Sequence, residues 1–234
     1  VQEATTRRLP DLKERHLPEN CRETINTILK ETYGYEQFRN LEIYDDLSKG
    51  KEKLCISQGQ LIENVILEAE KAWKGETQVD NILLTAPTGS GKSLLFQLPA
   101  IYLGKEYNLL TIVVSPLKAL IVDQVESLQE LGYMRVAYAS SDLSPEQKME
   151  VYRQVREGEI DLFYLSPELL LSYDIKHFVG ERRIGLVVVD EAHTVTTWGK
   201  EFRVDYWFLG RYLTALKQTL GYNFPLFALT ATAV

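Results

Sequence analysis

Six short apolar runs recur along the chain, and none shows the regular polar alternation of a strand with one exposed face. Such runs, rich in Val, Ile, Leu and Phe, are typical of strands that are covered on both faces. The runs are Asn81–Thr85, Leu109–Ser115, Arg135–Ala139, Asp161–Leu165, Leu186–Asp190 and Leu226–Thr230. Segments with helical spacing separate them, so we expect an α/β fold: a mostly parallel sheet with helices on both faces.

Two of the intervening segments carry a clear helical pattern. The apolar residues on one face of the first are Leu117, Leu120, Ile121, Val125 and Leu128. On the second, Met149, Tyr152 and Val155 share a face, and Ser144-Pro145 supplies an N-cap and a first-turn proline. We expect both apolar faces to pack on the sheet.

Residues 1–75 have a different pattern, and we interpret them as a helical arm packed on a sheet domain of residues 76–234. We predict helices at Asn20–Thr32 and Gly59–Trp73, with a turn at Tyr33–Arg39 after the first. Between them Asn40–Gln58 is charged and weakly periodic, and we interpret it as an insertion that lies at the surface. The expected buried face of the second helix comprises Leu61, Val65, Ile66, Ala69 and Trp73.

Length and composition limit the number of domains and the class of protein. The 234 residues, 45% of them hydrophobic, suffice for one large domain and an arm. No apolar run approaches the roughly 18 residues that span a bilayer, and the polar Val1–Asp11 lacks the apolar stretch of a signal peptide. Cys21 and Cys55 indicate two free thiols in a reducing compartment.

The net charge of −7 argues against nucleic-acid binding through bulk charge, although it leaves a local groove possible. We interpret Arg182 and Arg183 as a solvated surface pair.

The most specific motif is a glycine-rich segment, Ala86–Ser93, that follows one apolar run and opens a helix. Glycines let backbone N–H groups turn inward around phosphates, and the positive end of the following helix attracts the anion. This spacing predicts a phosphate loop in which Lys92 reaches the β and γ phosphates and Ser93 holds Mg²⁺. The predicted nucleotide contacts in the loop are Thr88, Gly89, Ser90, Gly91, Lys92 and Ser93.

An acidic pair follows the fifth apolar run, at Asp190-Glu191-Ala192-His193. Strand ends of such sheets point into the ligand crevice. We expect Asp190 to hold Mg²⁺, Glu191 to orient and deprotonate the attacking water, and His193 to relay the nucleotide state.

Together these segments resemble motifs I, II and III of superfamily 2 helicases, in which Ala is common at the first loop position. Further segments resemble the RecQ family. These are motif 0 at Tyr33–Arg39, motif Ia at Val114–Val125, motif Ib at Tyr164–Glu168, an aromatic-rich loop at Trp198–Tyr206, and motif III at Leu229–Ala233.

The resemblance implies that Tyr35 and Arg39 sandwich adenine while a glutamine reads its edge. In the family that glutamine comes three residues after the arginine. Here Asn40–Gln58 intervenes, so Gln60 takes the role if the insertion loops out, and Gln37 is the competitor.

The resemblance also implies nucleic-acid contacts. Trp198, Phe202 and Arg203 would sense single-stranded DNA, because aromatic faces stack on any base and arginine adds charge. The expected contacts to the DNA backbone are Ser115, Lys118 and Ser166. Thr230 and Thr232 would couple motif III to the acidic pair.

We therefore expect a RecA-like P-loop NTPase domain: the first lobe of an ATP-dependent 3′–5′ DNA helicase that uses ATP and Mg²⁺ and acts in DNA repair or recombination. Such a protein would work in the bacterial cytoplasm and nucleoid or the eukaryotic nucleus. We find no counterpart of the family's second lobe, so we expect feeble hydrolysis and no unwinding. Two alternatives stay open: an RNA helicase lobe of DEAD/DEAH type, and a nucleotide-gated adaptor that docks partners through Asn40–Gln58.

Overall fold

The computed structural model describes residues 17–44, 53–86, 89–192 and 202–230. Its centre is a six-stranded sheet in the order β3-β8-β7-β4-β6-β5, with every neighbouring pair parallel. The strands are β3 (Ile82–Thr85), β4 (Leu110–Val114), β5 (Val136–Ala139), β6 (Leu162–Leu165), β7 (Ile184–Val189) and β8 (Leu226–Thr230). Each lies within or beside one of the six predicted runs, which confirms the predicted parallel sheet.

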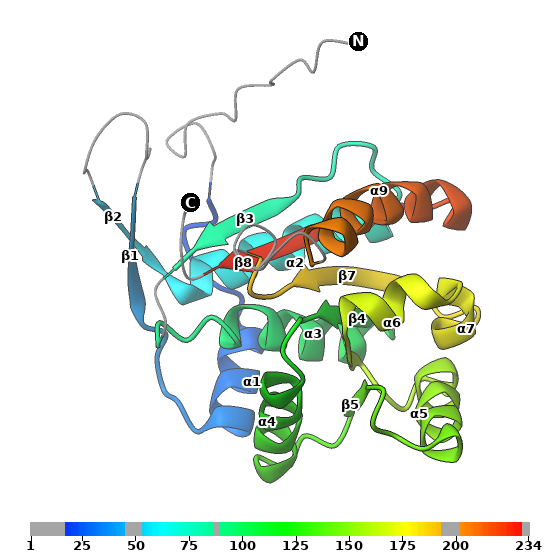
Figure 1. Cartoon of the computed structure of the whole chain (residues 1–234). Coiled ribbons are helices and arrows are strands. Elements are labelled where there is room, and N and C mark those ends of the chain that lie inside the picture. Colours follow the sequence, from blue (N-terminus) through cyan, green and yellow to red (C-terminus); the bar gives the residue numbers. More distant parts are fainter. Residues whose placement is uncertain (1–16, 45–52, 87–88, 193–201, 231–234) are drawn as a thin grey trace.

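Helices cover both faces of this sheet, as expected (Figure 1). One face packs against α1 (Glu23–Tyr33), α2 (Gln58–Trp73), α3 (Leu94–Tyr107) and α4 (Lys118–Glu130). The other packs against α5 (Pro145–Glu157), α6 (Pro167–Ser172), α7 (Ile175–Val179) and α9 (Phe202–Leu220). Alternate residues of one strand serve the two cores: in β7, Val188 faces the first and Val187 the second.

Two strands lie within the predicted insertion Asn40–Gln58, where the sequence analysis assigned no strand. Strands β1 (Asn40–Tyr44) and β2 (Lys53–Ser57) pair antiparallel, with Leu41 opposite Ile56. These two side chains are buried, and they are the apolar signal that the surrounding charged residues obscure. Figure 1 shows the hairpin standing at one side of the sheet.

The helix predictions were correct in position and partly wrong in burial. Ser144 and Gln147 form a capping box at the start of α5, which confirms that N-terminus. Met149 on α5 is 68% exposed, however, and Trp73 at the end of α2 is 38% exposed. Trp73 lies in the last turn, where the Arg183 guanidinium covers its ring at 4.6 Å from the centroid.

The pair Arg182-Arg183 is not a solvated surface pair. Arg182 is buried, and its Nη2 lies 3.0 Å from Oδ1 of the fully buried Asp161. Arg135 and Tyr133 complete the shell of that carboxylate. A buried carboxylate needs such partners. Arg182 therefore has a structural role, because it pairs with Asp161 directly before β6.

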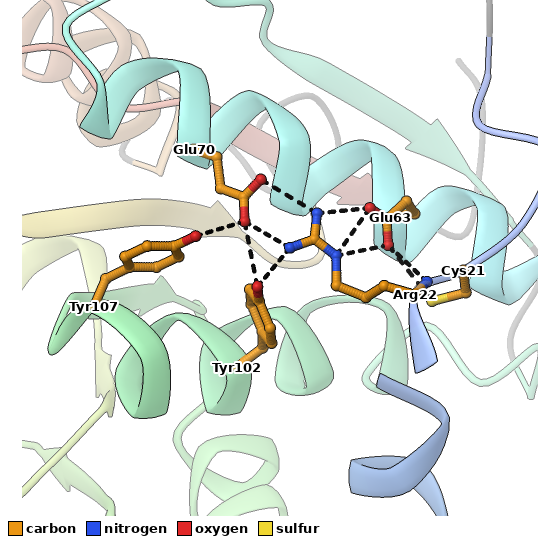
Figure 2. Close-up of polar contacts among 6 residues, drawn as sticks. All are labelled: Cys21, Arg22, Glu63, Glu70, Tyr102 and Tyr107. Carbon is orange, nitrogen blue, oxygen red and sulfur yellow. Dashed lines mark hydrogen bonds and ion pairs between the residues drawn. The ribbon is translucent and has the colours of Figure 1, made fainter. Parts of the chain in front are cut away.

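A second buried charge network ties the arm to the main domain (Figure 2). The guanidinium of Arg22, just before α1, donates to Glu63 and Glu70 of α2 and to the hydroxyl of Tyr102 on α3. Tyr107 also donates to Glu70, at 2.8 Å. We call these five residues the Arg22 cluster. Burial works to raise the pKa of Glu70, but hydrogen bonds from Arg22 and Tyr107 outweigh it and lower the pKa.

Within the described residues, no helix is long and apolar enough to cross a membrane. The two cysteines, Cys21 and Cys55, are free thiols. Burial is the main cause that raises the pKa of Cys21 to about 12, with the nearby Glu63 carboxylate adding to it.

Candidate nucleotide-binding site

The glycine-rich segment joins the end of β3 to the start of α3, where a phosphate loop must lie. Gly89 and Gly91 have φ angles of 81° and 78°, in the left-handed region that side chains disfavour. Helix α3 begins at Leu94, directly after Ser93. Its positive N-terminus therefore points at the loop. Pro87 and Thr88 lie outside the described residues, so a contact from Thr88 stays a prediction.

The side chains of the loop fit a bound phosphate group. The Lys92 ammonium donates to the Ala86 carbonyl oxygen at 3.2 Å, a single neutral acceptor for a charged donor. The Ser90 hydroxyl is buried and has no hydrogen-bond partner among the described residues. An orphaned buried donor beside a lysine and a helix N-terminus matches the chemistry of a triphosphate.

The acidic pair lies at the end of β7, in the same edge of the sheet. Asp190 is buried; its N–H donates to the Val114 carbonyl, and its Oδ1 accepts the N–H of Glu191 at 2.9 Å. Glu191 has a φ of 49°, which is uncommon for a residue with a side chain. Such strain clusters at functional sites, because surrounding structure must hold it in place.

Electrostatics link the acidic pair to the phosphate loop. Burial raises the pKa of Asp190, and the neighbouring Glu191 charge adds to the rise. The Lys92 ammonium and the Gln124 amide act in the opposite direction and lower the pKa of Asp190. The charge of Lys92 thus acts on Asp190, although their strands β3 and β7 are not neighbours.

Strand β8 joins the two halves of the site. The Ala86 N–H donates to the Thr230 carbonyl at 3.0 Å, and the Ala192 N–H donates to the Leu229 carbonyl at 2.8 Å. One strand end thus holds the first residue of the phosphate loop and the third residue of the acidic motif. Thr230 is buried at this junction. His193 and Thr232 lie outside the described residues, so their predicted roles stay predictions.

The residues expected to hold adenine lie at the end of α1, before β1 and at the start of α2. Tyr35 is 51% exposed and stacks on Tyr33 with ring centroids 6.3 Å apart, while Arg39 is exposed. Gln60 has both ends of its amide occupied: Oε1 accepts the Ser57 N–H at 3.0 Å and Nε2 donates to the Pro18 carbonyl at 3.1 Å.

Gln60 and its competitor Gln37 both line an open cavity of about 800 Å³ between α1 and the start of α2. Tyr35 and Arg39 are not among its lining residues. The choice between the two glutamines as adenine reader therefore stays open.

Gln58 is a residue that the sequence analysis missed. Its side chain is buried, its Oε1 accepts the Arg39 N–H at 3.2 Å, and its Nε2 donates to the Ser90 carbonyl at 3.1 Å. A Cβ added at Gly91 would lie 2.7 Å from that Nε2, so a side chain there would displace the Gln58 amide as well as strain the backbone. The signal available was a glutamine two residues before Gln60, at the start of a helix.

The residues expected to contact nucleic acid differ in burial, and the structure describes only some of them. Ser115 and Ser166 follow β4 and β6 and are buried, and the Ser166 hydroxyl caps α6 by accepting the Leu169 N–H. Lys118 is exposed and pairs with Asp142 at 3.0 Å. Trp198 and the side chains of Phe202 and Arg203 lie outside what the structure describes. Each nucleic-acid contact stays a prediction.

The chain is similar to curated DNA helicases over most of its length. It is 31% identical over 210 residues to the ATP-dependent DNA helicase RecQ of Haemophilus influenzae, covering 90% of this chain and 28% of the relative. It is 35% identical over 217 residues to that of Synechocystis, covering 91% and 38%. The chain thus spans between a quarter and two fifths of the length of these relatives.

Solved structures show the same fold at lower identity. The DUF1998 helicase MrfA bound to DNA and AMPPNP has a TM-score of 0.59 and 21% identity, covering 94% of this chain and 27% of that one. The Hef helicase domain of Pyrococcus furiosus has a TM-score of 0.51 and 21% identity, covering 73% and 32%. These likenesses agree with the RecA-like α/β fold.

The family model described as DEAD/DEAH box helicase matches residues 61–234, from α2 through the phosphate loop and the acidic pair to the end of the chain. With the parallel sheet, the loop at β3 and the carboxylates at β7 on one edge, this match shows that the chain belongs to the DEAD/DEAH box helicase family.

Proposed function

We propose that this chain forms the ATP-binding lobe of an ATP-dependent 3′–5′ DNA helicase of RecQ type. The observation that carries the proposal is that the end of strand β8 holds both motifs at one edge of the sheet. The Ala86 N–H, at the start of the Lys92 loop, donates to Thr230, and the Ala192 N–H, two residues after Asp190, donates to Leu229. A phosphate-binding cation beside a metal-binding carboxylate is the arrangement that phosphoryl transfer requires.

Each residue of the site has a distinct task in this proposal. Lys92 and the N–H groups at the start of α3 bind the β and γ phosphates. The Ser93 hydroxyl and the Asp190 carboxylate would hold Mg²⁺, which supplies charge neutralisation for the transferred phosphoryl group. Glu191 orients the attacking water and accepts its proton. Tyr35 and Arg39 sandwich adenine, with Gln60 or Gln37 at its edge.

DNA is the nucleic acid along which the proposed helicase moves. The relatives named above are DNA helicases, and the aromatic-rich loop from Trp198 to Tyr206 suits sequence-independent stacking on single strands. Ser115, Lys118 and Ser166 then contact the backbone, and Thr230 and Thr232 couple hydrolysis to movement. A protein with this activity works where chromosomal DNA lies, in the bacterial cytoplasm or the eukaryotic nucleus.

Titration with a fluorescent ATP analogue and Mg²⁺ tests the nucleotide site directly. We expect saturable binding by the wild type and at least tenfold weaker binding by Lys92→Ala, because a charge-assisted contact is worth about 1.5–3 kcal/mol. Lys105→Ala, a lysine in the last turn of α3, is the matched control and should bind like the wild type. Equal binding by Lys92→Ala and the control would refute the proposed site.

A comparison of strands tests the choice of DNA. Fluorescence anisotropy of labelled single-stranded DNA and RNA of one sequence, with Mg²⁺ and a non-hydrolysable ATP analogue, should show tighter binding to DNA. Trp198→Ala should weaken it, since each stacked base contributes about 1–3 kcal/mol. Preference for RNA would favour the RNA-helicase alternative.

A further inference from the structure

Three neighbouring strands of the sheet, β4, β6 and β5, are each followed directly by a serine: Ser115, Ser166 and Ser140. Because all pairs of strands are parallel, these serines lie on the edge of the sheet that also carries the phosphate loop and the acidic pair. Ligands of such sheets bind outside the carboxyl ends of the strands. The β5–α5 loop, residues 140–144, therefore lies on the ligand-binding edge.

Helix α4 begins at this edge with an N-terminus that has no capping side chain. Its N-cap is Leu117, and its first turn holds no acidic residue, whereas α5 and α6 are capped by Ser144 and Ser166. The Ser115 hydroxyl, two residues before Leu117, is buried and has no hydrogen-bond partner among the described residues. Uncapped N–H groups, the positive end of a helix and a nearby orphaned hydroxyl together favour an anion here.

A carboxylate of the protein itself already contacts this N-terminus. The Lys118 ammonium, on the first residue of α4, lies 3.0 Å from Oδ1 of Asp142 in the β5–α5 loop. The same ammonium donates to the Ser141 hydroxyl. We call this contact the Lys118–Asp142 pair. A carboxylate and a phosphodiester each present one negative charge over two oxygens, so Asp142 offers Lys118 what a phosphate of a nucleic-acid backbone would offer.

The β5–α5 loop holds the Asp142 carboxylate in place. The Asp142 N–H donates to the hydroxyl of the buried Ser140 at 3.3 Å, and the Ser141 hydroxyl donates to Asp142 Oδ1 at 3.2 Å. A second lysine, Lys148 of α5, donates to the Ser141 carbonyl at 3.4 Å. Because the loop orders the carboxylate, less conformational entropy is lost when Lys118 pairs with it.

Water reaches both members of the pair. The side chain of Lys118 is 47% exposed and that of Asp142 is 72% exposed. An exposed ion pair contributes little to stability and is weakened by salt. In contrast, the side chains of Arg182 and Asp161 are 4% and 0% exposed, and that pair holds the fold. The Lys118–Asp142 pair can therefore open when a competing anion arrives, without loss of the fold.

We propose that Asp142 is an internal competitor of nucleic-acid phosphate. It neutralises Lys118 in the free protein, and a backbone phosphate must displace it to reach Lys118 and the N-terminus of α4. This inference rests on the Lys118 contact of the proposed function, and it adds Asp142 as the residue that sets the affinity of that contact. A weakened contact suits a protein that moves along a strand, because each phosphate has to be released.

A double-mutant cycle on strand binding tests the competition. The dissociation constant of a fluorescently labelled oligothymidine strand is measured by anisotropy, without nucleotide, for wild type, Asp142→Asn, Lys118→Met and the double variant. We expect Asp142→Asn to bind about three- to fivefold more tightly, which is the size of effect that an exposed ion pair can have. Lys118→Met should bind about fivefold more weakly, and adding Asp142→Asn to it should change nothing further.

The control and the salt dependence separate this local effect from bulk charge. Glu150→Gln removes one carboxylate from the exposed ion pairs of Arg153 on α5, and it changes the net charge by the same amount. It should bind the strand like the wild type. In Asp142→Asn, binding leaves no carboxylate unpaired, so the plot of log affinity against log salt should be steeper by about 0.7. Glu150→Gln should keep the wild-type slope.

Spectra of the protein without a ligand test the pair itself. In ¹H–¹⁵N spectra, Lys118→Met should shift the backbone amide signal of Asp142, because the adjacent carboxylate loses its partner. Lys105→Met, at the end of α3, should leave that signal in place. Adding the oligothymidine strand to the wild type should move the Asp142 signal toward its position in Lys118→Met, since phosphate then frees the carboxylate.

The outcomes distinguish the competitor from the proposed function. If Lys118→Met weakens binding but Asp142→Asn binds like the wild type, the competitor is overturned and the Lys118 contact stands. The same conclusion follows if Asp142→Asn tightens binding equally in the Lys118→Met background, or if Glu150→Gln tightens it as much. An Asp142 signal that ignores Lys118→Met also overturns the competitor. A wild type that binds no strand, or a Lys118→Met protein that binds like it, refutes the proposed contact and the competitor together.

Discussion

The Arg22 cluster and the nucleotide site use similar side chains in opposite ways. In the cluster, two carboxylates of α2 share one guanidinium, and two tyrosine hydroxyls donate to one of them, Glu70 (Figure 2). At the site, Asp190 and Glu191 are adjacent carboxylates, and among the described residues the Lys92 ammonium donates only to the Ala86 carbonyl oxygen. The first arrangement is complete within the chain, whereas the second leaves charge for a ligand to complete.

The pKa values follow this contrast. Opposite charge and hydrogen bonds lower the pKa of Glu70 despite burial, while burial and a like charge raise the pKa of Asp190 despite Lys92. Buried carboxylates therefore stabilise this fold where they are paired with a cation, and they lower its stability where they are placed to bind a metal.

The largest expected effect comes from breaking the Arg22 cluster. Arg22→Met keeps the apolar stem but leaves Glu63 and Glu70 buried without their cation, which should cost about 3–5 kcal/mol of unfolding free energy. Urea unfolding followed by circular dichroism measures it. The control is Arg153→Met on α5, whose guanidinium pairs with carboxylates on the exposed surface and should matter little. Equal midpoints for the two variants would contradict the structural role.

A smaller loss of stability is expected from changes at Gln58, the first residue of α2, which contacts the phosphate loop. Gln58→Leu removes the donor to the Ser90 carbonyl and the acceptor for the Arg39 N–H. We expect nucleotide affinity to fall about tenfold and unfolding free energy by about 1–3 kcal/mol, because two buried backbone groups lose partners.

Gln58→Glu sharpens that experiment. As a carboxylate it keeps an acceptor for the Arg39 N–H but cannot donate to the Ser90 carbonyl, and it is buried without a cation. It should therefore lose affinity and at least as much stability as Gln58→Leu. A Gln58→Leu protein that binds nucleotide like the wild type would show that the contact does not shape the phosphate loop.

Acid should weaken the cluster selectively. Since the folded-state pKa of Glu70 is lowered, its contribution is full above the ordinary glutamate value of about 4.3 and is lost as pH falls through the lowered pKa. Wild type should therefore exceed Glu70→Gln in unfolding free energy at pH 7, and the gap should close as pH falls toward 3. A gap that stays constant over this range would argue that the charge of Glu70 contributes nothing.

The smallest effect should have the opposite sign. Asp190→Asn removes a buried charge whose pKa is raised, so we expect a gain of about 0.5–1 kcal/mol in thermal unfolding experiments. The same variant should lose the Mg²⁺ enhancement of nucleotide binding. A loss of stability would instead mean that Asp190 is held mainly by favourable contacts.

Local pattern predicted most of the fold. The strand runs and the capping residue Ser144 are signals contained in a few neighbouring residues, and the structure confirms the elements that they predicted. The phosphate loop and the acidic pair could be predicted for the same reason, because glycines after one apolar run and a carboxylate doublet after another need no tertiary information.

The missed features depend on partners far along the chain. In the β1–β2 hairpin Leu41 is buried opposite Ile56, and a short pair within charged sequence carries no clear period. Arg182 is buried because Asp161 lies beside it after folding. Gln58 matters through Ser90, which is distant in sequence. Composition and periodicity contain none of these pairings.

The strand order has a consequence for how the site is assembled. Strand β3 leads into the phosphate loop and lies at the end of the sheet, where it pairs with β8 in the described structure. Its residue Ile82 therefore has no strand partner until Phe227 of β8 has been synthesised. During synthesis the segments between these strands emerge and pack before β3 has its neighbour. Closing so long a loop is entropically slow. The edge that carries Lys92 is thus completed late, and a chain interrupted before β8 would expose β3 as an unpaired strand prone to association with other chains.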